Sequence, residues 1–331
     1  MTKRERVQAA LSGQAVDRVP VGFWGHDFLR EWSPQGLAAA TIEAYHKYGW
    51  DFIKVNPRAT YYAEAWGSRY QPSGNDREQP RLVEPALKSA ADLRRLQPLD
   101  PHHGPFGEQL QALRLIAGEL AGEVPFVQTV FCPLGVIGRL AGGDAAKVRS
   151  LMREAPADLH TALAAVAATL GDYAVACLEA GADGIFFATV EWASRDTATE
   201  DEYREYGRPY DLQVLARVQD APFNILHVCR DHNMLDLLLD YPVHAFQWAA
   251  NRPTNATLRD GLTKTGKAVL GGISQDSTLV QGTPQQVAAE MQAALAQTGG
   301  RRFLLGPGCS VSPQTPEANL RAVLGALTSQ P

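Results

Sequence analysis

The feature that most constrains the fold of this 331-residue chain is a repeated alternation of short β-branched and aromatic runs with long helical segments. Each run has the length of a buried strand, and each intervening segment is long enough for a helix and its connections. A strict β-α order predicts a parallel sheet with right-handed crossovers. The eight predicted strands are Val19–Trp24, Asp51–Val55, Pro125–Phe131, Gly184–Val190, Phe223–Cys229, Ala245–Trp248, Ala268–Ile273 and Phe303–Gly308.

The number of strands decides between two α/β architectures. Eight β-α units predict closure into a (β/α)8 TIM barrel, whereas six or seven would favour an open doubly wound sheet. The least regular of the eight runs is Ala245–Trp248. An extra helix precedes the first strand, because Thr2 and Glu5 form a capping box and Gly13 provides a helix end. We find no internal repeat and no long linker, so we expect a single barrel domain over residues 1–331.

Composition excludes several classes of function. The formal net charge is −5 and no basic run is interleaved with aromatic residues, so we expect no nucleic-acid partner. The longest uncharged stretch, Val124–Gly138, is shorter than the roughly 18 apolar residues that span a bilayer. The first six residues, four of which are charged, lack the apolar core of a secretory signal. The sequence therefore predicts a cytoplasmic protein with no membrane partner.

Three residues at predicted strand ends form a candidate metal site. His227 and Cys229 are two apart at the end of one strand, so their side chains point to the same side. Cys309 ends the last strand after Gly306-Pro307-Gly308. Functional residues of a barrel lie at the carboxyl ends of its strands, and a Cys2His set with an open fourth position is a known catalytic zinc site. The alternative is that all three are small buried residues with no ligand.

The other cysteines have simpler interpretations. Four cysteines are too few for a disulfide framework in a chain of this length. Cys177 lies in an amphipathic helical segment and is expected in the core, and Cys132 ends the third strand as a core or pocket residue.

Further polar and aromatic residues at strand ends are candidates for substrate binding and catalysis. Lys54, Asn56 and Arg58 alternate along one strand and share a face, which predicts either an anion-binding site or a buried salt-bridge network. Glu191 could complete a zinc tetrahedron or act as a base, or could simply pair with Arg195. The predicted substrate-binding residues are Trp24, His26, Lys54, Asn56, Arg58 and Gln128; Gln247 and Gln275 also lie at strand ends, with no role assigned.

Several motifs make the whole chain resemble the uroporphyrinogen decarboxylase superfamily. These motifs are Arg4–Val7, Asp17–Val21, Glu179–Asp183, Gly282–Pro284 and Thr315–Leu320. One branch of that superfamily comprises metal-free uroporphyrinogen decarboxylases. The other comprises corrinoid-linked methyltransferases, including the methylcobamide:coenzyme M enzymes, whose zinc site has the form His-x-Cys … Cys. The resemblance to this second branch implies that His227, Cys229 and Cys309 bind Zn²⁺.

Two departures count against the decarboxylase branch. Its first strand is followed by an arginine-rich segment that binds substrate carboxylates, but here Phe23–Phe28 contains no arginine. Its essential aspartate corresponds, by an ungapped match ending at Gly67, to Arg58. A cation at this position is a poor partner for a protonated pyrrole.

The resemblance and the predicted ligands together imply a reaction. We expect a zinc-activated thiol to accept a methyl group from a methylated corrinoid, a co-substrate carried on a separate corrinoid protein, because no segment of this chain resembles a corrinoid-binding module. Two alternatives stay open. One is a lyase that decarboxylates a porphyrinogen or another acid, and the other is a non-catalytic barrel with a structural zinc.

Overall fold

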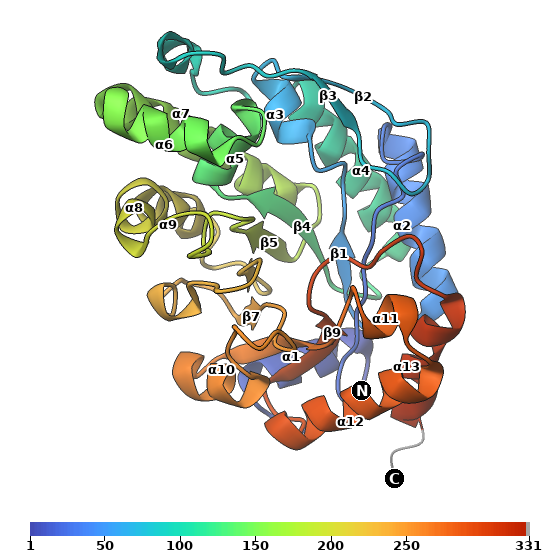
Figure 1. The fold of residues 1–331 in the computed structure, drawn as a ribbon. Coiled ribbons are helices and arrows are strands. Elements are labelled where there is room, and N and C mark those ends of the chain that lie inside the picture. The colour runs from blue at the N-terminus through green and yellow to red at the C-terminus, as the bar shows by residue number, and fades with distance from the viewer. Residues whose placement is uncertain (329–331) are drawn as a thin grey trace.

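In the computed structural model, which describes residues 1–328, seven parallel strands form one curled sheet in the order β1-β4-β5-β6-β7-β8-β9. Each strand of this sheet pairs with the strand of the sheet that follows it along the chain. The sheet therefore curls in one direction (Figure 1), unlike a doubly wound sheet, in which the chain runs from the centre to both edges. The strands are β1 Ile53–Val55, β4 Phe126–Phe131, β5 Gly184–Ala188, β6 Ile225–His227, β7 Ala245–Gln247, β8 Ala268–Ile273 and β9 Phe303–Pro307. Seven of the eight predicted strands are therefore confirmed, including Ala245–Trp248.

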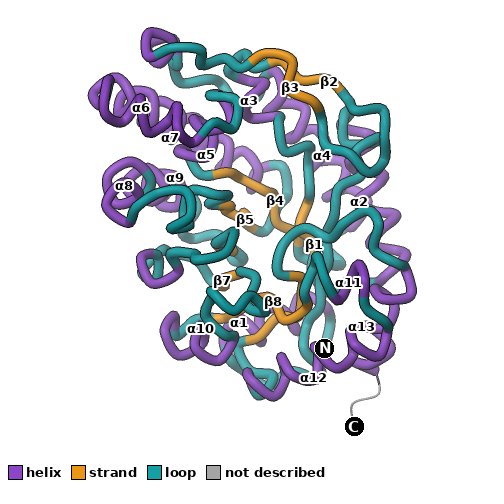
Figure 2. Tube along the Cα trace, in the orientation of Figure 1, coloured by secondary structure: helices purple, strands orange, loops and turns teal. Residues whose placement is uncertain are grey.

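Helices surround this sheet, and Figure 2 shows the short strands joined to them by long loops. The helices are α1 Lys3–Ser12, α2 Pro34–Tyr48, α3 Tyr61–Ala65, α4 Gly104–Leu120, α5 Pro133–Leu140, α6 Ala145–Glu154, α7 Pro156–Glu179, α8 Glu200–Tyr206, α9 Arg208–Ala216, α10 Leu258–Thr265, α11 Thr278–Gln281, α12 Pro284–Thr298 and α13 Glu317–Thr328, with 3₁₀ turns at Ala90–Arg95 and Leu235–Leu237. The capping box of Thr2 and Glu5 at α1 is present, so the extra N-terminal helix is confirmed.

The predicted strand Val19–Trp24 is not formed, and a complete eight-stranded barrel is not confirmed. The segment lies between β9 and β1, with Gly22 N–H donating to Leu305 O at 3.1 Å and Asp51 N–H donating to Val21 O at 2.7 Å. Only isolated bridges result, Val21 to Leu305 and Gly25 to Val311. Two features explain this, one local and one distant in the sequence. Pro20 has no N–H, and the Val21 N–H donates to the Asp51 carboxylate at 2.9 Å instead of to a neighbouring strand.

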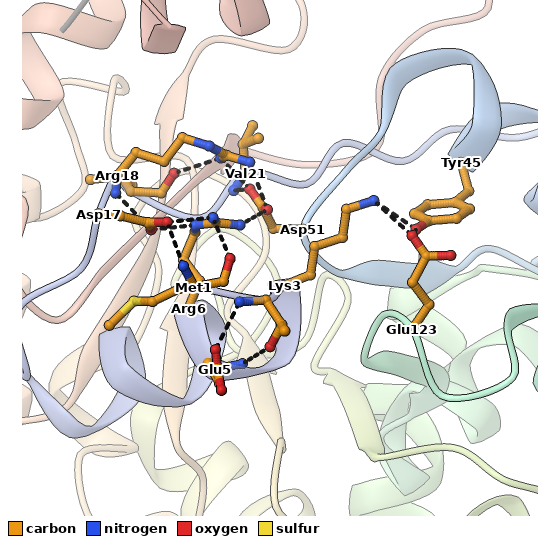
Figure 3. Close-up of polar contacts among 12 residues, drawn as sticks. Met1, Lys3, Glu5, Arg6, Asp17, Arg18, Val21, Tyr45, Asp51 and Glu123 are labelled. Carbon is orange, nitrogen blue, oxygen red and sulfur yellow. Dashed lines mark hydrogen bonds and ion pairs between the residues drawn. The ribbon is translucent and has the colours of Figure 1, made fainter.

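A buried ionic network fixes this segment against α1 and the start of β1 (Figure 3). The carboxylate of Asp51 is fully buried and accepts hydrogen bonds from Arg6 at 2.7 Å and from Arg18 at 2.5 and 2.9 Å. Arg6 also contacts Asp17 through two bonds of 2.7 Å. Each charge in the network has a partner of opposite sign, which offsets the cost of its burial.

Two further features of the fold are a hairpin that was not predicted and a long apolar helix. The antiparallel pair β2 Arg69–Gln71 and β3 Arg81–Glu84 forms a hairpin outside the main sheet. The helix α7 is long and apolar enough to span a membrane by length and composition, but 61% of the relevant window is buried within the protein. That burial is typical of a core helix, and Cys177, which lies on α7, is fully buried as expected.

Candidate metal centre

The three predicted metal ligands come together at the carboxyl ends of β6 and β9. His227 is the last residue of β6, Cys229 follows it by two residues, and Cys309 follows the end of β9 by two residues. Their donor atoms all lie within 4.8 Å of one another. Arg230, directly after Cys229, adopts a φ of +72°, a left-handed conformation that turns the chain sharply away from the sheet. His227 is buried, while both cysteines are partly exposed.

This geometry fits a tetrahedral zinc ion. Zn–S bonds of about 2.3 Å and Zn–N bonds of about 2.1 Å place sulfur and nitrogen about 3.6 Å apart on a tetrahedron. The distance from Cys309 Sγ to His227 Nε2 is 3.7 Å. Among residues 1–328, no fourth histidine, cysteine or carboxylate joins this group. The residues present therefore supply three soft ligands and leave one coordination position for an exogenous ligand.

The two thiols influence each other in the metal-free site. The hydrogen bond from Cys229 holds the pKa of Cys309 well below the usual range, against the effect of burial. The same contact raises the pKa of Cys229, as does its burial. One thiolate thus forms readily and the second needs a cation beside it, which a divalent metal supplies.

Aromatic side chains and one buried lysine form the wall next to the cysteines. The ring of Phe186, on β5, stacks on His227 with centroids 5.3 Å apart, and Trp24 packs edge-on against Phe186 at 5.4 Å. The ammonium group of Lys54 lies 4.9 Å from the Phe186 ring centroid and 5.9 Å from that of Trp24. Burial lowers the pKa of Lys54 to about 7, while the charges of Cys309 and Glu31 oppose this shift. Lys54 is thus a buried amino group within electrostatic reach of Cys309.

A cavity of about 500 Å³ extends from Lys54 toward α2 and the start of α13. Trp24, His26, Lys54 and Asn56 all line it. Lys54 donates to Asn56 Oδ1, while Asn56 Nδ2 is buried and has no partner. His26 Nδ1 lies 2.7 Å from Glu31 Oε2. Four of the six predicted substrate-binding residues therefore line one cavity, whereas His227, Cys229 and Cys309 are not among its lining residues.

The structure places the other predicted site residues elsewhere. Arg58 is buried and ion-paired with Glu64 at 3.0 Å and Glu108 at 2.8 Å, which is the salt-bridge network that its position also allowed. It therefore does not share a free anion-binding face with Lys54. Gln128 donates to Tyr173 on α7 at 2.8 Å, so its side chain points into the helical layer.

Glu191 is not one of the grouped metal donors. It lies near Arg139, whose pKa is raised, first by Tyr62 and also by Glu191. The expectation that Glu191 completes the zinc tetrahedron therefore finds no support, and a catalytic role for it stays a prediction.

One polar residue was noted without a role and turns out to contact the centre. Gln247, on β7, pairs in register with His227, and its Oε1 is hydrogen-bonded to His227 Nδ1. Its position at a strand end was visible in the sequence, but the contact depends on the β6–β7 register.

A parallel, curled α/β sheet with a Cys2His group at the carboxyl ends of its strands defines the class, a barrel-like α/β protein with a candidate metal site. The family of this chain follows from its sequence: residues 2–329 match the uroporphyrinogen decarboxylase (URO-D) family model, and the chain belongs to that family. The resemblance inferred from the motifs is confirmed.

Relatives within the family differ in how much of the chain they match. A methylcobamide:CoM methyltransferase, MtbA, of Methanosarcina acetivorans is 24% identical over 98% of this chain and 96% of its own length. A uroporphyrinogen decarboxylase of Chlorobium phaeovibrioides is 28% identical over 73% of this chain and 70% of its own. Among solved structures, a methyltransferase from Methanosarcina mazei has the same fold, with a TM-score of 0.80 at 22% identity, covering 99% of this chain and 98% of its own. The similarity to methyltransferases thus extends over nearly the whole chain.

Proposed function

We propose that this protein is a zinc-dependent methyltransferase, acting as one domain, that moves a methyl group from a methylated corrinoid to a thiol. The observation that carries the proposal is the three-ligand group of His227, Cys229 and Cys309, with no fourth donor among the described residues. A structural zinc site is normally closed by four protein ligands, whereas a catalytic site keeps a position open. The methyltransferase relatives that match the whole chain support the same reaction class.

The ligand set suits the activation of a thiol. A zinc ion held by His227, Cys229 and Cys309 would lower the pKa of a thiol substrate and, because two of its ligands are thiolates, would leave the substrate sulfur electron-rich. In the transfer, the thiolate sulfur attacks the methyl carbon, the cobalt–carbon bond breaks, and its electron pair stays with the corrinoid. The thiol proton has already left to solvent. Cys229 and Cys309 supply the negative charge, and His227 supplies a neutral donor.

The residues of the cavity suit the remainder of the substrate. Lys54 has a single hydrogen-bond acceptor, Asn56 Oδ1, and Asn56 Nδ2 has none. These buried donors favour an acidic group on the thiol, held beside the aromatic wall of Trp24 and Phe186. His26 lines the same cavity and is a candidate contact for the distal part of the substrate. Arg58 is left out of this assignment because two carboxylates already neutralise it.

The partners follow from the reaction. We propose a small thiol as acceptor and a separate corrinoid protein as carrier of the donor, in the cytoplasm. The metal-free decarboxylase alternative is disfavoured because the position of its essential aspartate holds Arg58 in a salt-bridge network. The structural-zinc alternative is disfavoured by the open ligand position.

The direct test combines metal analysis with a thiol screen. We expect about one zinc per chain, and demethylation of methylcobalamin, followed by absorbance, with at least one acidic thiol. Cys309→Ala is expected to lose both zinc and activity. Cys177→Ala, which removes a thiol buried on α7 away from the centre, is the matched control and is expected to keep both. Protein without zinc, or zinc-loaded protein inactive with every thiol, would contradict the proposal.

A further inference from the structure

The side-chain amide of Gln247 is fully buried and is held at both ends. Its nitrogen donates to the carbonyl oxygen of Pro307 at 2.7 Å, and its oxygen is hydrogen-bonded to Nδ1 of His227. Pro307 is the last residue of β9, two residues before Cys309. One amide therefore connects the strand end that carries His227 with the strand end that carries Cys309.

The chemistry of these partners fixes which proton His227 carries. A backbone carbonyl can only accept a hydrogen bond, so the nitrogen of the amide must face Pro307 and the oxygen must face the imidazole. An amide oxygen can also only accept, so Nδ1 of His227 must be the donor. In the neutral imidazole this leaves the lone pair on Nε2. Nε2 is the atom that faces Cys309 Sγ at 3.7 Å.

The orientation of the ring is restrained from a second direction. Phe186 stacks on the imidazole with an interplanar angle of 26°, which limits its tilt, while the bond from Nδ1 limits its rotation in its own plane. The two contacts together aim Nε2 at the point where the thiols converge. Ligating histidines commonly depend on such a partner at the other ring nitrogen.

We infer that Gln247 is a positioning residue of the metal centre, which holds His227 as the Nδ1–H tautomer with Nε2 directed at the metal position. The inference rests on the proposed function for its biological purpose. Its physical content, the tautomer and the aim of the ring, does not depend on methyl transfer.

The first test uses the wild-type protein without metal. In ¹⁵N-labelled protein above neutral pH, the His227 ring, assigned by its loss in His227→Asn, is expected to show a protonated Nδ1 and an unprotonated Nε2. A protonated Nε2 in the folded wild-type protein would overturn the inference, whatever the protein's activity.

The second test measures zinc affinity by competition with a chromophoric chelator. Gln247→Met keeps the shape but removes the acceptor, and is expected to raise the zinc dissociation constant about 10- to 100-fold. Gln247→Glu keeps an acceptor for Nδ1–H but, when ionised, loses the donor to Pro307 O, and is expected to lose less affinity than Gln247→Met. Gln109→Met is the matched control, because Gln109 is also buried and donates to a proline carbonyl, Pro105 O, but lies on α4.

Each outcome supports or contradicts the positioning role of Gln247. Wild-type zinc affinity in folded Gln247→Met, or an equal loss in Gln247→Met and Gln247→Glu, would contradict a positioning role. If Gln247→Met does not fold, the Glu variant and the wild-type tautomer still decide it. If neither the wild-type protein nor any variant binds zinc, the proposed function is wrong, but the tautomer measurement still tests the role of Gln247.

Discussion

Replacing Lys54 by methionine should stabilise the protein and weaken its binding of acidic thiols. Burial lowers the pKa of Lys54 from 10.5 to about 7. At about 1.4 kcal/mol for each tenfold change in the proton-binding constant, holding this group charged in the fold costs about 5 kcal/mol. Against this, the substitution leaves Asn56 Oδ1 without its donor, a loss of about 1–3 kcal/mol. The net expectation is a gain of about 2–4 kcal/mol.

This gain has a predicted melting temperature and a predicted pH dependence. With an unfolding entropy of about 2.1 cal/mol/K per residue, the Tm of a chain of this length should rise by about 3–6 °C. The pKa of Lys54 is lower in the folded than in the unfolded state. The advantage of Lys54→Met is therefore full at and below about pH 7 and shrinks as the pH rises toward 10.5. Calorimetry on metal-free protein at several pH values measures both.

The kinetic effect should have the opposite sign. Loss of a charged hydrogen bond, about 1.5–3 kcal/mol, is expected to raise KM for acidic thiols about 10- to 150-fold, with kcat and uncharged thiols spared. Lys267→Met is the matched control, since Lys267 is partly buried, also has a pKa lowered by burial and donates to the Tyr241 carbonyl at 2.8 Å. A lower Tm for Lys54→Met, or an equal rise in KM for charged and uncharged thiols, would refute the reasoning.

Three further predictions concern the frame and the reaction class. Asp51→Asn removes the buried carboxylate between Arg6 and Arg18 and should lower the free energy of unfolding by about 3–5 kcal/mol. The Tm in thermal unfolding should fall by about 4–7 °C, and a change below about 1 °C would show that the network does not stabilise the fold. Burial raises the pKa of Asp211 to about 7, although Tyr203 and Tyr241 donate hydrogen bonds to its carboxylate. The stability linked to protonation of Asp211 is therefore full below about pH 4 and is lost as the pH rises to about 7. Asp211→Asn should flatten this part of the pH profile of urea unfolding. The protein should not convert uroporphyrinogen to coproporphyrinogen, because the position that the resemblance assigns to the essential aspartate is occupied by Arg58, paired with Glu64. Product above a heat-killed control, followed by fluorescence after oxidation, would contradict this.

The strand pattern could be predicted because most strands are buried on both faces and therefore consist of nearly continuous apolar runs. The predicted strand Val19–Trp24 did not form, although its apolar run resembles the runs of the strands that did. The difference lies in Asp51, distant by about thirty residues, which takes the Val21 N–H. A local sequence pattern does not reveal that a side chain far away in the chain will accept the hydrogen bond of a backbone N–H.

The grouping of the three candidate metal ligands could be predicted from the sequence for a geometric reason. A two-residue spacing puts His227 and Cys229 on one side of a strand, and parallel strands bring Cys309 to the same edge. The sequence alone therefore determined the strand-helix order, the capped N-terminal helix and the grouping of the three soft ligands.

Tertiary structure decided what the remaining polar residues do. Lys54 and Arg58 look equivalent on an alternating strand, but β1 ends at Val55, and Arg58 pairs with Glu64 and Glu108 while Lys54 stays at the cavity. Gln247 gained its contact with His227 from strand register, and Gln128 lost its expected place because it bonds to Tyr173. Spacing fixes the side of a strand on which a residue lies. The partner that neutralises or orients the residue comes from segments far away in the chain, and only the folded molecule brings them together.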